Sequence, residues 1–194
     1  MNWKNTPQRY SAVLVALHWL MLLLLVAVYA LMELRDLTPR GSALRAGMKS
    51  LHFSLGLCVL ALVTARLAAR WTSGATPPIA PPMPPWQARL ARFMSVALYV
   101  FMIAMPLLGW LALSADDKPV ALFGLALPSL LAPDTGLAHR LEDAHEALGT
   151  IGYFLIGLHA AAGLFHHYVV KDNTLRRIGL RAERSVPHPA RSRR

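Results

Sequence analysis

The apolar residues of the chain are gathered into four blocks rather than spread along its length. The blocks cover residues 11–32, 51–69, 93–113 and 145–170. Each is close to the ~20 residues that a helix needs to span the hydrocarbon core of a bilayer. The pattern therefore predicts an all-α fold, in the form of a four-helix transmembrane bundle.

The connections between the blocks differ in character. Residues 76–85 contain six prolines, which exclude a helix and predict a semi-rigid connector along the surface. Pro106 and Gly109 predict a kink in the third helix. The connection 114–140 is long, and its apolar stretch 122–127 suggests a short helix lying on the membrane interface.

The chain shows no repeat at a fixed period and no sign of a second domain. Residues 1–177 are expected to form one membrane domain, followed by a disordered, basic cytoplasmic tail at residues 178–194. The first apolar block begins after Arg9 and lacks a small-residue cleavage site at its end. We therefore expect this block to be retained rather than removed as a signal peptide.

Composition and charge agree with a protein in membrane lipid. Of the 194 residues, 55% are hydrophobic and only 15% are charged, against about 25% charged in soluble domains. The net charge of +10 could indicate a nucleic-acid partner. Topology explains it better, because cytoplasmic termini put fourteen of the 20 lysines and arginines on the inner side. We expect both termini to be cytoplasmic and no nucleic acid to bind.

Four histidines lie in or at the ends of the apolar blocks, where ionisable side chains are costly and usually functional. His145 and His159 are fourteen residues apart, which is about 40° short of four full turns and ~21 Å along a helix axis. Their imidazoles therefore point the same way at two depths. His52 lies at the outer depth and His18 at the inner depth. Depth thus pairs His52 with His145 and His18 with His159.

Each predicted pair offers one ligand from each of two helices, as in bis-histidine haem held inside a bundle. Gly56, Gly149 and Gly163 follow three of the histidines by four residues, on the same helix face, where a missing side chain leaves room for a flat macrocycle. A bare zinc or copper ion would need a third ligand, and none occurs at either depth. The alternative, interhelical hydrogen bonding alone, leaves the matched depths unexplained.

Two further groups of residues are candidates on the inner side. His166 lies seven residues after His159, nearly on the same face and ~10 Å nearer the inner surface. A quinone headgroup could dock there, although a histidine that merely reaches the interface would look the same. Arg66 and Arg70 could pair with propionates of an inner haem, or simply anchor the positive inner side.

On the outer side, Arg40, Arg45 and Lys49 precede His52. These three residues could form a basic rim over an outer haem. The outer side carries eight acidic residues against six basic ones. Any attraction for an anion must therefore be local to this rim rather than a property of the whole face.

The histidine contexts resemble those of the bacterial cytochrome b561 family. The resemblance covers about residues 8–177 and is most specific in the final segment. It rests on the stretches Leu17-His18-Trp19, Leu51-His52, Ala144-His145-Glu146, residues 152–162 around His159, His166-His167-Tyr168, and residues 171–175.

This resemblance implies a small inner-membrane protein with two haem b groups, whose axial ligands are His18, His52, His145 and His159. It implies superoxide oxidase activity, also called superoxide:ubiquinone oxidoreductase. Superoxide would give one electron at the outer haem, and the inner haem would reduce ubiquinone. No catalytic side chain is expected beyond the haems, since superoxide releases its electron without losing a proton.

Two other functions remain open at this point. A di-haem membrane-anchor cytochrome would relay electrons between a protein partner and the quinone pool, with residues 114–140 as the docking face. A non-redox membrane protein, such as a transporter, would leave the histidine pairing unexplained. The chain also lacks the inverted repeats that many transporters show.

Overall fold

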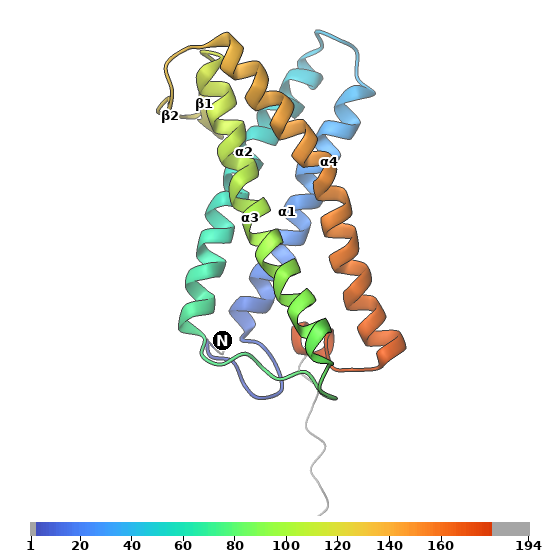
Figure 1. The fold of residues 1–194 in the computed structure, drawn as a ribbon. Helices are drawn as coiled ribbons and strands as arrows, with labels where there is room; N and C mark the ends of the chain where they lie inside the picture. The colour runs from blue at the N-terminus through green and yellow to red at the C-terminus, as the bar shows by residue number, and fades with distance from the viewer. Residues whose placement is uncertain (1–2, 180–194) are drawn as a thin grey trace, which may run out of the picture.

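The computed structural model describes residues 3–179 and consists of four long helices (Figure 1). Each helix is long and apolar enough to cross a membrane, so the predicted all-α transmembrane bundle is confirmed. Of the predicted tail 178–194, Ile178 and Gly179 are described, and their carbonyls accept hydrogen bonds from Trp19 and Arg9. Residues 180–194 lie outside the described residues. The helical elements are α1 (Ala12–Asp36), α2 (Ala43–Thr72), α3 (Pro85–Ala115), α4 (Thr135–Phe165), the π-helical turn η1 (His166–Val170) and the 3-10 turn η2 (Arg176–Ile178).

The helices begin in polar flanks that hydropathy does not mark, so they are longer than the apolar blocks. Ser11, Ser42 and Asp134 precede α1, α2 and α4, and each side chain accepts a hydrogen bond from a backbone N–H in the first turn. Such caps satisfy donors that have no partner within the helix. Pro85 opens α3, where its missing N–H costs nothing. Pro106 does not end α3, which continues to Ala115.

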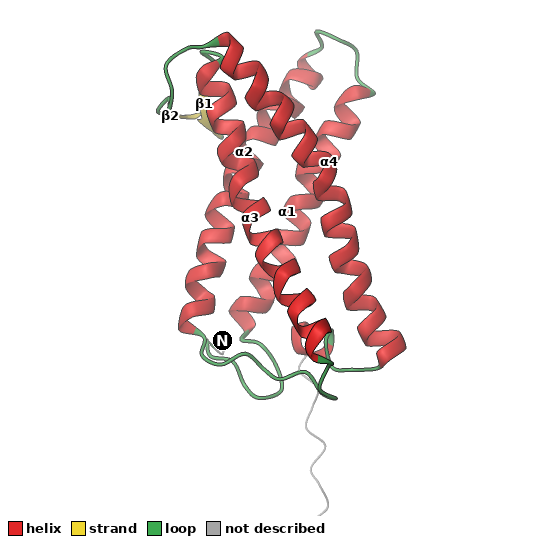
Figure 2. Ribbon diagram, in the orientation of Figure 1, coloured by secondary structure: helices red, strands yellow, loops and turns green. Residues whose placement is uncertain are grey.

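Irregular backbone lies mainly at the two ends of the bundle (Figure 2). The proline-rich connector is non-helical between Thr72 and Pro85, as predicted. It is held by residues 171–179, which we call the C-terminal strap. In the strap, Asn173 donates to the carbonyl of Pro78 and accepts from the N–H of Ala80, at 3.2 and 2.9 Å.

The strap also ties the start of the chain to its end. The buried Arg177 donates to the carbonyl of Pro77, and its guanidinium lies 5.4 Å from the centre of the Tyr10 ring. The indole of Trp19 donates to the carbonyl of Ile178 at 2.9 Å. One end of the bundle is therefore closed by contacts among α1, the connector and the strap.

The expectation of a short interface helix within residues 122–127 is wrong. Strands β1 (Val120–Leu122) and β2 (Leu125–Leu127) form an antiparallel hairpin. Phe123 and Gly124 form the turn with φ of 49° and 90°, as a two-residue hairpin turn requires. A six-residue apolar run cannot distinguish helix from strand by periodicity, and its glycine and flanking prolines favoured the hairpin.

Ser54 of α2 fixes this hairpin against the bundle. Its hydroxyl donates to the carbonyl of Ala121 at 3.2 Å and accepts from the N–H of Phe123 at 3.0 Å. Backbone groups near membrane depth need such partners. Ser54 is about half a helical turn from His52, so the hairpin lies at about the same depth along the bundle as that histidine.

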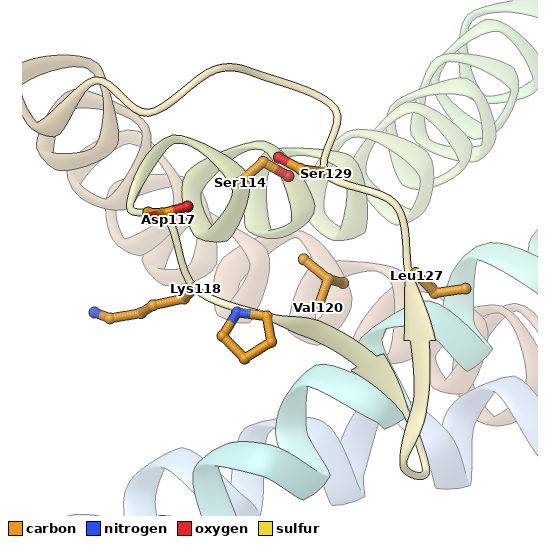
Figure 3. Close-up of a pocket in the computed structure, with 7 residues that line it drawn as sticks. Ser114, Asp117, Lys118, Val120, Leu127 and Ser129 are labelled. Carbon is orange, nitrogen blue, oxygen red and sulfur yellow. The ribbon is translucent and has the colours of Figure 1, made fainter.

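A cavity of about 270 Å³ lies between the hairpin and the end of α3 (Figure 3). Ser114 and Ser129 lie close together along it, whereas the Lys118 side chain extends away. The lining includes none of the paired histidines. It consists of Ser114, Asp117, Lys118, Pro119, Val120, Leu127 and Ser129.

The close packing is uneven among the helices. The most extensive packing is between α1 and α2 and between α3 and α4, and the packing between α2 and α3 is less extensive. Among the long helices, α4 makes extensive backbone contact with α3 alone. The apolar core comes from α1, α2 and α3. It is formed by Met21, Val59, Val63, Phe101 and Met102.

Candidate functional site

Two pairs of histidine rings face each other inside the bundle. His52 of α2 and His145 of α4, the hairpin-side pair, have ring centroids 6.3 Å apart with planes at 75°. His18 of α1 and His159 of α4, the terminus-side pair, have centroids 6.3 Å apart at 71°. These are the same two pairs that the sequence predicts from the depth of each histidine in the membrane. Their ligation of haem remains a prediction.

The spacing of each pair fits an ion held between two imidazoles. Two metal–nitrogen bonds of about 2 Å, together with the distance from each nitrogen to its ring centre, place the centroids about 6 Å apart. The histidines of α4 also meet those of α1 and α2 although α4 packs its backbone mainly on α3. The rings therefore bridge the interior of the bundle, where bundle proteins hold cofactors.

The ring of His52 is oriented by the backbone of α1. Its Nδ1 lies 3.0 Å from the carbonyl of Val28. A carbonyl can only accept, so Nδ1 carries the proton and Nε2 keeps a lone pair for a metal. A hydrogen bond of this kind is the usual support of a metal-binding histidine.

The ring of His145 is enclosed by α3. A Cβ on Gly109 would lie 3.3 Å from Cε1 of His145, so the glycine permits this close approach. Nδ1 of His145 is buried without a well-formed hydrogen bond, although the Met105 backbone is near. Gly109 is thus a site residue that the sequence suggested only as a kink, because its contact with His145 lies across two helices.

The three predicted haem-cradle glycines have different surroundings. A Cβ on Gly56 would meet no atom within 4 Å, which leaves open space one turn from His52. A Cβ on Gly149 would meet the end of Met105 at 3.7 Å, and one on Gly163 would meet Leu175 at 3.6 Å. These are ordinary contacts with flexible side chains.

The two arginines near the end of α2 are placed differently. Arg66 donates to the carbonyl of Leu14 at 2.9 Å, one turn before His18, and its charge acts on both rings of the terminus-side pair. Arg70 instead donates to the hydroxyl of Thr76 in the connector at 3.0 Å and is exposed. Of these two arginines, only Arg66 lies beside the terminus-side pair.

The basic residues on the hairpin side line a depression of about 390 Å³ between α1 and α2. Arg45 is held there by the carbonyl of Arg35 at 2.6 Å and by Asp36 at 3.0 Å. Arg40, which the sequence grouped with this rim, is absent from the lining, and Arg35 takes its place. The lining consists of Arg35, Gly41, Ser42, Arg45, Ala46 and Lys49.

Lys49 connects this depression with the hairpin-side pair. Its ammonium lies 5.7 Å from the centre of the Phe53 ring, and that ring lies 6.0 Å from the ring of His52. The negative charge of Asp116, just beyond the end of α3, opposes the positive charge of Lys49. A hydrogen bond with Lys118 lowers the pKa of Asp116, with help from the charge of Lys49. Asp116 is therefore a carboxylate at neutral pH and reduces the positive field around Lys49.

His166, in η1, is held by a buried acid on the strap. Its Nδ1 lies 2.7 Å from Oδ2 of Asp172, whose Oδ1 accepts from the N–H of Thr174 at 2.8 Å. Burial alone would raise the pKa of Asp172, but hydrogen bonds with Thr174 and His166 outweigh it and lower the pKa. The sequence did not reveal Asp172, because a polar residue just after an apolar helix ordinarily indicates solvent.

Within residues 3–179, no group of three or more His, Cys, Asp or Glu side chains is arranged to hold a bare metal ion. The histidines that face each other do so in twos. This donor set fits a group that brings its own equatorial ligands, since haem needs only two axial ligands from the protein.

Comparison with known proteins gives consistent matches over nearly the whole chain. Residues 9–179 match the family model described as prokaryotic cytochrome b561. The chain is 38% identical over 170 residues to cytochrome b561 homolog 1 of Escherichia coli K12, covering 88% of this chain and 96% of that protein. It is 37% identical over 171 residues to "Probable superoxide oxidase CybB" of Yersinia pestis, with coverage of 88% and 96%. Cytochrome b561 homolog 2 of Escherichia coli K12 is 29% identical over 179 residues, with coverage of 92% and 95%.

Proposed function

Because the chain belongs to the prokaryotic cytochrome b561 family, we propose that it is a superoxide oxidase, which takes electrons from superoxide and delivers them to ubiquinone. Family membership itself makes the chain a multi-pass bacterial membrane protein of electron transfer that binds haem b. The number of haems, the donor and the acceptor are the proposal. A relative from Yersinia pestis is named a probable superoxide oxidase.

The observation that carries the proposal is the pair of facing imidazoles at each of two levels, both with centroids 6.3 Å apart. His52 with His145 and His18 with His159 would each hold one haem b. When bound, the haems supply the reversible one-electron chemistry. Two levels about 21 Å apart along α4 suit transfer between the faces of the membrane.

On the hairpin side, the chain's own residues would attract the anionic donor. Arg35, Arg45 and Lys49 line one depression, and Lys49 reaches toward the Phe53 ring beside His52. Superoxide is small and carries one negative charge, so a locally positive surface near the pair is sufficient to guide it. No side chain has to accept a proton at this step.

On the terminus side, Arg66 would hold a haem propionate and His166 would bind the quinone. Arg66 lies beside His18 and His159 and has unused donors for a carboxylate. His166 lies about 10 Å beyond His159 on nearly the same face, where a headgroup of ubiquinone can enter from the lipid. The excess of lysine and arginine in the segments on this side supports a cytoplasmic position for it under the positive-inside rule.

The test is a stopped-flow experiment on the purified, oxidised protein. Mixing with superoxide is expected to produce reduced b-type haem bands quickly, and adding ubiquinone is expected to reoxidise them. Haem bands that do not respond to superoxide would contradict the proposed donor. Absence of a Soret band after production with ample haem would contradict the haem sites themselves.

A second candidate function is a membrane-anchor cytochrome that relays electrons between a protein partner and the quinone pool. The hairpin favours it, because Phe123 and Leu125 at its tip are 65% and 66% exposed. Exposed aromatic and aliphatic side chains are typical of docking surfaces. Haems that are inert to superoxide but readily reoxidised by ubiquinone would favour this function over the first.

A further inference from the structure

We propose that His166 and Asp172 form a proton-donating dyad for quinone reduction, in which Nε2 of His166 protonates a quinone oxygen and Asp172 positions the ring. This inference rests on the proposed function, since it concerns the same quinone site. It assigns a role to Asp172 that no spacing in the sequence suggests. It also specifies which atom of His166 acts.

The geometry fixes the ring in one orientation. Asp172 is 4% exposed, and its Oδ2 lies 2.7 Å from Nδ1 of His166. The backbone N–H of Asp172 donates to the carbonyl of His166 at 3.1 Å, so the two residues are joined twice. With Nδ1 turned toward Asp172, Nε2 lies on the opposite edge of the ring. It makes no hydrogen bond to any residue that the structure describes.

The local backbone is shaped to make this contact. His166 begins a π-helical turn, a wider turn than α-helix that is frequent at functional sites. Lys171 then adopts a left-handed conformation with φ of 60°, which reverses the chain. The reversal carries Asp172, six residues after His166, back onto the imidazole.

Among the charged residues at this end of the bundle, His166 is the one that pairs with Asp172. Among residues 3–179, no lysine or arginine lies within 4 Å of the Asp172 carboxylate. Arg9 donates to the carbonyl of Gly179, and Arg177 to that of Pro77. A nearby positive charge stabilises a buried carboxylate, and His166 can supply one to Asp172 whenever its imidazole is protonated. Neighbouring Lys171, Arg176 and His167 make no ion pair with the dyad.

The chemistry of the proposed reaction requires such a group. Reduction of one quinone to quinol takes two electrons and two protons, while two superoxide ions supply two electrons, release two O₂ and supply no protons. Both protons must therefore come from water on the quinone side. In the proposed step, Nε2–H of His166 passes one proton to a quinone oxygen and is reprotonated from water, and the second oxygen takes its proton from water. Asp172 stays ionised and stabilises the imidazolium, as a carboxylate does beside a general-acid histidine.

The test measures reoxidation of the full-length, haem-loaded protein, reduced with dithionite, by a soluble ubiquinone analogue between pH 6 and 9. His166→Gln keeps an amide donor for Asp172 but has no titratable proton, and it is expected to slow reoxidation by about 100-fold. Asp172→Asn is expected to slow it less and to move the pH profile to lower pH. The double variant should be no slower than His166→Gln, because Asp172 acts only through His166. His167→Gln, at the adjacent imidazole, is the control.

A second readout is independent of activity. In protein with ¹⁵N-labelled histidine, NMR should show His166 titrating at a lower pH in Asp172→Asn than in the wild type, with His167 unchanged. Wild-type reoxidation rates in His166→Gln with normal haem spectra would overturn the dyad and leave the proposed function intact. A wild-type protein that ubiquinone does not reoxidise would instead overturn the proposed function.

Discussion

At the scale of single residues, the four paired histidines differ in how their rings are held. His52 is fixed by the carbonyl of Val28, and His145 is enclosed by Gly109. The ring of His18 stands edge-on to Trp19 with centroids 5.6 Å apart. Each pair has its own supports, contributed by different helices. Removal of one histidine should therefore abolish haem binding at its own pair and leave the other pair intact.

Removal of one hairpin-side histidine tests this independence. His52→Ala or His145→Ala is expected to lower the haem content from two to one per chain and to stop reduction by superoxide. The haem of the terminus-side pair should keep its spectrum, because His18 and His159 are untouched. The measurement is the haem-to-protein ratio with redox difference spectra. His139→Ala, an exposed imidazole at the same end of α4, is the control. Loss of both haems together would contradict the pairing.

At the scale of elements, Gly152 shows how closely α4 approaches its neighbours. A Cβ at this position would collide with the hydroxyl of Tyr29 and the ring of Phe101. Gly157 lies in the same helix and would meet no atom within 4 Å. We expect Gly152→Ala to destabilise the protein by about 1–3 kcal/mol, as overpacking does. Gly157→Ala should be neutral or slightly stabilising. Thermal unfolding in detergent measures both, and equal effects would contradict the packing of α4.

The strap contributes stability that depends on pH. The pKa of Asp172 is lowered in the folded protein by its hydrogen bonds with Thr174 and His166. A lowered carboxyl pKa stabilises the fold above the unfolded value of about 3.9, and this stabilisation is lost as pH falls through the folded pKa. The melting temperature should therefore fall more steeply with acid in the wild type than in Asp172→Asn. Parallel pH profiles below pH 5 would show that the strap does not depend on this carboxylate.

Elements with a strong local signal were predictable from the sequence, and contacts across elements were not. Four apolar blocks predict four helices, and helical geometry matches the histidines by depth from their spacing alone. The hairpin was missed because Phe123 in a left-handed turn is unusual and the run 122–127 is short. Asp172 was missed because its partner, His166, is reached only through the chain reversal at Lys171.

At the scale of the whole molecule, the two faces differ in charge. Of the 15 lysines and arginines in residues 3–179, nine lie toward the end of the bundle where the strap is, while the hairpin end holds six of them together with eight acidic residues. Much of the positive charge there is already paired. Asp36 pairs with Arg35 and Arg45, and Asp116 with Lys118. Lys49 is the basic residue at this end that contacts an aromatic ring beside His52 instead of a carboxylate.

This balance predicts opposite effects for two substitutions on the rate of haem reduction by superoxide. Lys49→Gln removes a positive charge near the hairpin-side pair and should slow the reaction about threefold at low salt. Asp116→Asn removes a negative charge that acts on Lys49 and should accelerate it by a similar factor. Both effects should shrink as salt rises, because the screening length falls to about 10 Å at 0.1 M. Arg140→Gln, exposed on α4, serves as the control. If the three variants and the wild type share one rate and one salt dependence, superoxide does not enter beside Lys49 and the electron must arrive by another surface.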